Sequence, residues 1–180
     1  MKVLLMCAGG YTTSALMAKM QKFAEEGDVI DAKGAASFSA EVDNYDVFLV
    51  GPQVRHLYKK IEAEAYSKGK AVGQIDPRQY ALMDGEAMMK QAQAIQKDMM
   101  KAKDEIDNTE FVGESSLVKI TMKGTKEVTK VEITAEDSLE KEDIEMLEDM
   151  IVVAINDANK KIDKMTEQKM SKFGNIPGLF

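Results

Sequence analysis

The sequence predicts an α/β fold followed by an α+β fold, and three observations lead to this prediction. Short apolar runs alternate with helical segments over the first half of the chain, a pattern typical of a parallel sheet with flanking helices. Beyond residue 87, a long helical stripe precedes a pair of alternating strands and a second long helix. We therefore expect a four-stranded parallel sheet over residues 1–87 and a helix–β-hairpin–helix dimerisation module over residues 88–180.

The composition limits the class of protein. The 180 residues carry a formal net charge of −7, with one cysteine and one histidine. A single cysteine excludes an intramolecular disulfide and, with only one histidine, makes a structural zinc site unexpected, so we predict no metal and no cofactor. No apolar run is long enough to span a bilayer, and the start lacks the basic segment of a signal peptide, which predicts a cytoplasmic protein.

The first half contains four predicted strands. Apolar runs of strand length occupy residues 3–6 and 47–50, and two further short strands are expected over residues 29–32 and 71–75. Helices are expected from residue 15 and over residues 57–66, each followed by a glycine that stops it, and a loop with one helical turn is expected over residues 37–43. Because the carboxyl ends of parallel strands share one edge, the segments that follow these strands should meet there, where ligands bind in such sheets.

The segment Cys7-Ala8-Gly9-Gly10-Tyr11-Thr12-Thr13-Ser14 joins the first strand to the first helix and is the candidate site. Backbone N–H groups in such a turn point into one concavity, and the helix dipole adds partial positive charge, so phosphate is the expected ligand. A cysteine at this position is predicted to act as a thiolate nucleophile. The alternative is a small buried hydrophobic residue, but the position at a strand's carboxyl end favours the nucleophile.

A cysteine at the head of a phosphate loop fits two kinds of chemistry. A protein tyrosine phosphatase of the low-molecular-weight kind needs an arginine six residues after its cysteine, to grip the phosphoryl oxygens, and an aspartate as general acid. The sixth residue after Cys7 is Thr13, whereas Asp76 followed by Pro77 resembles the acid loop of that family. Hydrolysis should be slow without the arginine, which favours a phosphoryl carrier over a phosphatase-like enzyme.

Three motifs in the first half resemble the IIB component of the bacterial phosphoenolpyruvate:sugar phosphotransferase system, of the lactose/cellobiose type. They are residues 3–14, Gly51-Pro52-Gln53-Val54-Arg55, and residues 75–86. The resemblance implies that Cys7 accepts a phosphoryl group from a histidine of a IIA protein and passes it to a sugar bound in a membrane IIC permease. Residues 8–14 would surround the phosphate, with Gln53 and Arg55 at the edge of the site. Tyr11-Thr12 departs from the commoner methionine-serine of that loop.

The second half is predicted to form two long helices and a hairpin. An apolar stripe at alternating steps of four and three marks a helix that merges with the preceding one, over about residues 84–107. Its members are Met88, Ala92, Ile95, Met99, Ala102 and Ile106. Residues 117–122 and 128–133 alternate around a turn at Lys123-Gly124-Thr125, which predicts a hairpin. A second helix over about residues 141–172 carries an apolar face made of Ile144, Leu147, Ile151, Ala154, Ala158, Ile162 and Met165. Because this core is thin, we expect a homodimer.

This half resembles the YbaB/EbfC family of nucleoid-associated proteins from about residue 88 onward. The resemblance is carried by residues 89–93, 112–115, 118–124, 128–133, 146–150 and 154–158, and by the final Pro177-Gly178-Leu179-Phe180. It implies a homodimer that binds DNA with little sequence preference.

The charge of the second half bears on DNA binding. From Glu86 onward the sequence has 14 lysines, no arginine and 20 acidic residues, a net charge of −6. DNA binding would therefore need lysines collected on one face. Lys160, Lys161 and Lys164 form the candidate DNA contact, and the alternative is a solvated helix end that complements the helix dipole.

The two resemblances together predict a phosphoryl carrier fused to a dimeric, nucleoid-associated DNA-binding module. Cys7 would then make the first module a protein-cysteine phosphotransferase, and the second module would be non-enzymatic. The competing hypothesis is a non-enzymatic nucleoid protein whose first domain serves as a docking scaffold.

Overall fold

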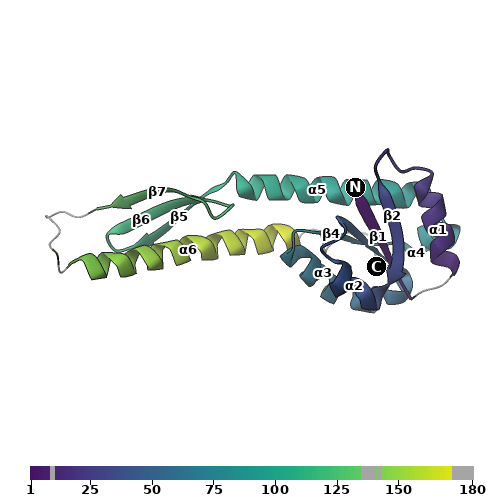
Figure 1. The fold of residues 1–180 in the computed structure, drawn as a ribbon, viewed down its shortest axis with the longest axis horizontal. Helices are drawn as coiled ribbons and strands as arrows, with labels where there is room; N and C mark the ends of the chain where they lie inside the picture. The colour runs from purple at the N-terminus through teal and green to yellow at the C-terminus, as the bar shows by residue number, and fades with distance from the viewer. Residues whose placement is uncertain (9–10, 135–140, 142, 172–180) are drawn as a thin grey trace. The chain divides into compact units, whose positions relative to one another are not determined.

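The first half of the chain folds around the parallel sheet that its apolar runs predict (Figure 1). Neighbouring strands pair parallel throughout, in the order β2-β1-β3-β4. Their bounds are β1 Lys2–Cys7, β2 Val29–Gly34, β3 Val47–Val50 and β4 Ala71–Gln74. The predicted four-stranded parallel sheet is therefore confirmed, with each strand within two residues of its expected ends.

In this computed structural model the chain divides into two compact units, unit 1 with residues 1–101 and unit 2 with residues 102–171. The structure describes residues 1–8, 11–134, 141 and 143–171. Within these ranges, no helix is both long enough and apolar enough to span a membrane. The boundary between the units falls inside a helix, whereas the family resemblances predict a division near residue 87.

Helices cover both faces of the unit 1 sheet. On one face Leu4, Met6 and Phe48 pack with residues of α2 (Phe38–Glu41) and α3 (Tyr58–Ser67). The opposite face receives α1 (Tyr11–Gln21) and the first part of α5 (Gly85–Asp107). Because side chains alternate along a strand, a sheet covered on both faces buries all of them, and β3 is buried along its whole length.

The first part of α5 belongs to unit 1 by its packing. A Cβ added at Gly73 on β4 would lie 2.3 Å from Ile95 Cδ1, so the helix lies directly on the strand. The Gln91 side-chain amide also donates to the Gln74 carbonyl at 2.7 Å. The predicted apolar stripe is confirmed by burial at five of its six positions, Met88, Ala92, Met99, Ala102 and Ile106.

Several short helical segments complete unit 1. The polar stretch after β2 forms η1 (Ala35–Ser37) and then α2, as the predicted loop with a helical turn implies. A further turn, η2 (Pro52–Leu57), follows β3. The helix α4 (Pro77–Leu82) was not predicted, although Asp76 followed by proline is an N-terminal helix signal.

Unit 2 has three antiparallel strands where the sequence predicts two. β6 (Val118–Lys123) and β7 (Val128–Ile133) form the expected hairpin, and β5 (Glu110–Ser115) adds a strand on the other side of β6. The alternation in β5 is broken by Gly113, which lies against α6 (Asp143–Ser171). A Cβ there would meet the Ala154 carbonyl oxygen at 1.9 Å, so the missing side chain allows this close approach.

The helix α6 runs along β5 and β6 (Figure 1). Its buried residues are Ala154, Ala158 and Ile162, and they pack with Ile120 and its neighbours on the sheet. The prediction that Ile144 shares this apolar face is wrong, because its side chain is 49% exposed. It lies in the first turn of the helix, before the stretch that packs with the sheet.

Candidate functional site

Cys7 ends β1 at the carboxyl edge of the unit 1 sheet. Cys7 is only 4% exposed, and its backbone pairs with Gly34 of β2. The thiol donates to the Lys33 carbonyl oxygen at 3.8 Å. The structure therefore places the cysteine at the strand tip that the sequence predicts, with its sulfur held against the neighbouring strand.

The helix α1 begins within the candidate phosphate loop, at Tyr11. Gly9, Gly10 and the side chains of Tyr11 and Thr12 lie outside the described residues. Thr13 is buried at 4% exposure, whereas Ala8 and Ser14 are exposed. The first-turn N–H groups of a helix lack intrahelical partners and attract anions, so this end of α1 can hold a phosphate beside Cys7.

Thr13 also distinguishes this site from a phosphatase loop. Where a phosphatase needs a guanidinium, the first turn of α1 carries a buried hydroxyl, which can donate one hydrogen bond and brings no charge. An arginine in a phosphatase loop would bind a phosphoryl dianion through charge-assisted hydrogen bonds, whereas Thr13 can offer only an uncharged hydrogen bond.

The turn after β3 lies against the end of β1. The Gly51 N–H donates to the Met6 carbonyl oxygen at 2.8 Å, which ties this turn to the residue before Cys7. Gln53 and Arg55, predicted at the site edge, are exposed residues of η2, and so is His56. The structure thus brings the Gly51-Pro52-Gln53 turn to the edge where Cys7 lies.

Asp76 caps the helix α4, which accounts for the proline that follows it in the sequence. Its carboxylate accepts hydrogen bonds from the Arg78 N–H at 2.8 Å and the Gln79 N–H at 3.1 Å, and so caps α4. The Asp76 carboxylate is thus engaged at the start of α4, as expected of an N-cap residue. The Asp76-Pro77 pair is therefore a helix start here rather than a phosphatase acid loop.

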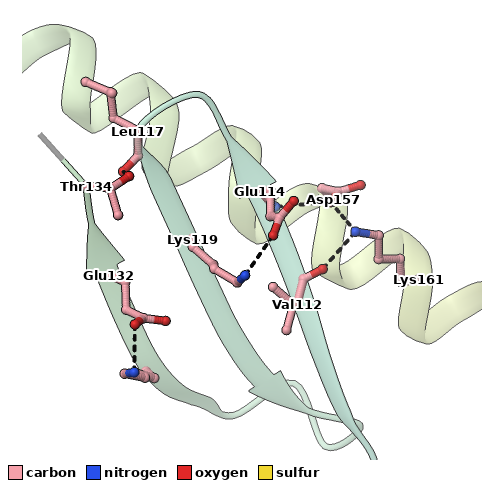
Figure 2. A network of polar contacts seen from close by, with 9 residues as sticks. Val112, Glu114, Leu117, Lys119, Glu132, Thr134, Asp157 and Lys161 are labelled. Atoms are coloured by element: carbon pink, nitrogen blue, oxygen red, sulfur yellow. Dashed lines mark hydrogen bonds and ion pairs between the residues drawn. The ribbon is translucent and has the colours of Figure 1, made fainter. Parts of the chain in front are cut away.

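Several lysines of unit 2 are engaged in ion pairs. Lys161 donates to the Asp157 carboxylate at 2.7 Å and to the Val112 carbonyl oxygen at 2.8 Å, and Figure 2 shows this link from α6 to β5. The Lys161 hydrogen bond is the main cause that lowers the pKa of Asp157. In the described part of unit 2 the other paired lysines are Lys119, Lys126, Lys130 and Lys169.

Lys160 and Lys164 are exposed and one helical turn apart on α6. Lys161, the third residue of the candidate DNA contact, is the one held by Asp157 and β5. The structure therefore separates the three lysines into two on an open face and one bound within the unit.

The apolar face of unit 2 extends beyond its helix. Ile133 and Val131 of β7 stand opposite Val118 and Ile120 of β6, so they share the face on which α6 packs. Yet Val131 is 50% exposed and Ile133 46%, because α6 packs along β5 and β6. Val128 is 42% exposed as well, which leaves an uncovered apolar strip along β7.

Comparison with known proteins yields two family matches, one for each half. The family "PTS system, Lactose/Cellobiose specific IIB subunit" matches residues 2–91. The "YbaB/EbfC DNA-binding family" matches residues 82–176. The chain belongs to both families. Both resemblances inferred from the sequence are thereby confirmed, and the first half is a component of the sugar phosphotransferase system.

Curated relatives match the YbaB/EbfC half. A nucleoid-associated protein of Ligilactobacillus salivarius is 40% identical over 99 residues, covering 54% of this chain and 95% of that protein. One from Coxiella burnetii is 45% identical over 94 residues, covering 51% of this chain and 84% of that protein.

Solved structures match the IIB half. A cellobiose-specific IIB component from Borrelia burgdorferi is 30% identical, with a TM-score of 0.48, and the match covers 55% of this chain and 94% of that chain. A lactose-specific IIB domain from Streptococcus pneumoniae is 20% identical, with a TM-score of 0.47, and the match covers 53% of this chain and 96% of that chain.

Proposed function

We propose that the IIB-family half is a cytoplasmic phosphoryl carrier, and that Cys7 is the residue that is phosphorylated. The donor would be a phosphohistidine of a IIA protein, and the acceptor a sugar bound in a membrane IIC permease. The observation that carries this proposal is the position of Cys7, at the carboxyl end of β1 and directly before the N-terminus of α1. Residues 8–14, with the α1 N–H groups, would hold the phosphoryl oxygens.

The transfer is a pair of balanced displacements. The Cys7 sulfur attacks phosphorus, an S–P bond forms as the N–P bond of the phosphohistidine breaks, and the thiol proton ends on the departing imidazole nitrogen. A sugar hydroxyl then attacks the same phosphorus, the S–P bond breaks, and the hydroxyl proton returns to the sulfur. Both steps depend on positioning and on stabilisation of charge on the phosphoryl oxygens.

Two features favour this carrier over a phosphatase-like enzyme. Thr13 stands where a phosphatase requires arginine, and Asp76 is occupied as the cap of α4. A thiophosphate without the arginine and the general acid should resist water and survive until an acceptor docks.

The deciding experiment is the intact mass of the full chain after incubation with phosphoenolpyruvate and the general and IIA phosphotransferase proteins. The wild type should gain one phosphoryl group, and Cys7→Ser should gain none under the same conditions. No gain on the wild type would overturn the carrier proposal and favour the competing hypothesis of a docking scaffold.

For the second half we propose a homodimeric module that binds DNA with little sequence preference. The family match supports DNA binding, and the uncovered strip of Val128, Val131 and Ile133 supports dimerisation. Lys160 and Lys164 offer exposed positive charge, while the Lys161 ammonium is paired with Asp157. Mobility shift of a random duplex at several salt concentrations tests this proposal, because phosphate contacts weaken steeply with salt. Unchanged retardation by a Lys160→Ala, Lys164→Ala double variant would show that other residues make the contact.

A further inference from the structure

The turn that follows β3 is bonded to the candidate site through its backbone. Gly51 donates to the Met6 carbonyl oxygen at 2.8 Å, and Val54 donates to the Gly51 carbonyl oxygen at 3.1 Å. The first bond joins the turn to β1, and the second closes the turn on itself. Gly51 therefore has a fixed position relative to the residue that precedes Cys7.

Gly51 has no side chain, and a Cβ at this position would lie close to three other groups. A Cβ built there would lie 3.0 Å from the Met6 carbonyl oxygen, 3.0 Å from Gln53 Oε1 and 3.9 Å from Cys7 Cα. The exposed Gln53 side chain thus folds back over Gly51 toward the end of β1, instead of extending into solvent. The Gln53 amide and the Cys7 Cα therefore border the same position, that of the missing Gly51 Cβ.

An amide at this point suits a phosphoryl group on sulfur. The phosphocysteine would carry negative charge on three oxygens, and a glutamine side chain offers two N–H donors without a positive charge. A half-turn of the terminal torsion exchanges Oε1 and Nε2, so either end of the amide can face the site. The Lys33 ammonium, on the strand beside Cys7, is paired with Glu41.

We propose that the Gln53 side-chain amide binds the phosphoryl group on Cys7, and that Gly51 is required because a side chain there would displace this amide. The proposal rests on the carrier function proposed above. A neutral donor replaces the arginine of a phosphatase loop: it orients the phosphoryl oxygens and leaves the phosphorus less activated toward water.

The test uses the full chain, phosphorylated from phosphoenolpyruvate through the general and IIA proteins and followed by intact mass. Gln53→Ala should lower the rate of phosphoryl gain about tenfold or more, since a hydrogen bond to a charged group is lost. Gln53→Glu should lower it further, because a carboxylate repels the dianion, and Gln53→Asn should recover part of the rate. Gln21→Ala, at an exposed glutamine on the last residue of α1, is the matched control and should behave as wild type.

Two further measurements separate binding from a structural role. Gly51→Ala should reduce the rate in the same direction, and the Gly51→Ala, Gln53→Ala double variant should lose less than the two single losses combined. The side-chain amide resonances of Gln53 should shift when the wild type is phosphorylated. A wild type that gains phosphate while Gln53→Ala reacts at the same rate, or an unshifted Gln53 amide, would overturn this proposal alone. No gain on the wild type would overturn the carrier function as well.

Discussion

The two sheets of this chain differ in how much of their apolar surface the chain itself covers. In unit 1, helices lie on both faces, and Phe48 on β3 is fully buried. In the described part of unit 2 the helix α6 covers β5 and β6, and Val131 on β7 remains half exposed. A parallel sheet built from βαβ units brings its own covering helices, whereas a three-stranded antiparallel sheet with one helix does not. Unit 1 thus covers both faces of its own sheet, whereas the described part of unit 2 leaves an apolar face that a second copy of the chain would cover.

The largest expected effect is the unfolding of unit 2, which has the thinner core of the two units. Gly113→Val should cost about 4 kcal/mol or more and unfold unit 2, because its side chain would overlap the Ala154 carbonyl oxygen. Hydrogen exchange by mass spectrometry should show lost protection of β6 while β1 stays protected. Gly34→Val is the control, since nothing lies within 4 Å of a Cβ there. Equal protection in both variants would contradict the close packing of β5 on α6.

The second prediction concerns the core of the doubly covered sheet. Phe48→Ala should destabilise unit 1 by about 3–5 kcal/mol, because it removes a fully buried ring that packs edge-to-face with Phe38 and leaves a cavity. Phe23→Ala removes a ring that is 47% exposed and should cost well under half as much. Denaturant unfolding of the two variants checks the difference, and similar midpoints would count against the buried position of Phe48.

The third prediction sharpens the comparison by making the same substitution in both units. Val131→Thr on β7 should weaken self-association about tenfold, since it places a hydroxyl on the uncovered strip. Val29→Thr on β2, where the valine is 42% exposed, should leave self-association unchanged. Sedimentation equilibrium over a range of concentrations measures both, and a Val131→Thr protein that associates like wild type would exclude this strip from the interface.

The smallest effect is a dependence on pH within unit 2. The Lys161 hydrogen bond lowers the pKa of Asp157 below its ordinary value of 3.8 in the folded protein. Its contribution is therefore present above the unfolded pKa and is lost as pH falls through the folded value. Asp157→Asn should lower the melting temperature slightly at about pH 7, and the gap should close at about pH 2. A gap that widens on acidification would contradict this assignment.

The parts of the fold that the sequence predicts well are those that burial alone determines. The strands β1 and β3 are apolar because both faces of the sheet are covered, so each appears in the sequence as a short, nearly continuous apolar run. The strand β5 was missed because Gly113 interrupts its alternation for a reason that only the packing of α6 reveals. The helix α4 could have been predicted from Asp76 and Pro77, whose likeness to a phosphatase acid loop drew attention away from their role as a helix start.

The candidate site shows the same division between local and long-range information. The position of Cys7 follows from the end of an apolar run, which the sequence displays directly. The bond from Gly51 to Met6 joins segments more than forty residues apart in sequence, and no local pattern encodes it. Likewise, Lys160, Lys161 and Lys164 of α6 look alike in sequence, but Lys161 is the one whose bond to an acceptor on β5 the structure shows.

The helix α5 bears on which insertions and deletions this sequence can accept. The two families overlap on residues 82–91, and the helix packs on β4 through Ile95 before it reaches unit 2, where Gly124 lies against the Ile106 backbone. A flexible spacer would tolerate gained or lost codons, but one residue inserted between Ile95 and Ile106 turns their faces by about 100° relative to each other. A gained or lost codon in this stretch would thus change the register between the face of α5 that carries Ile95 and the face that carries Ile106.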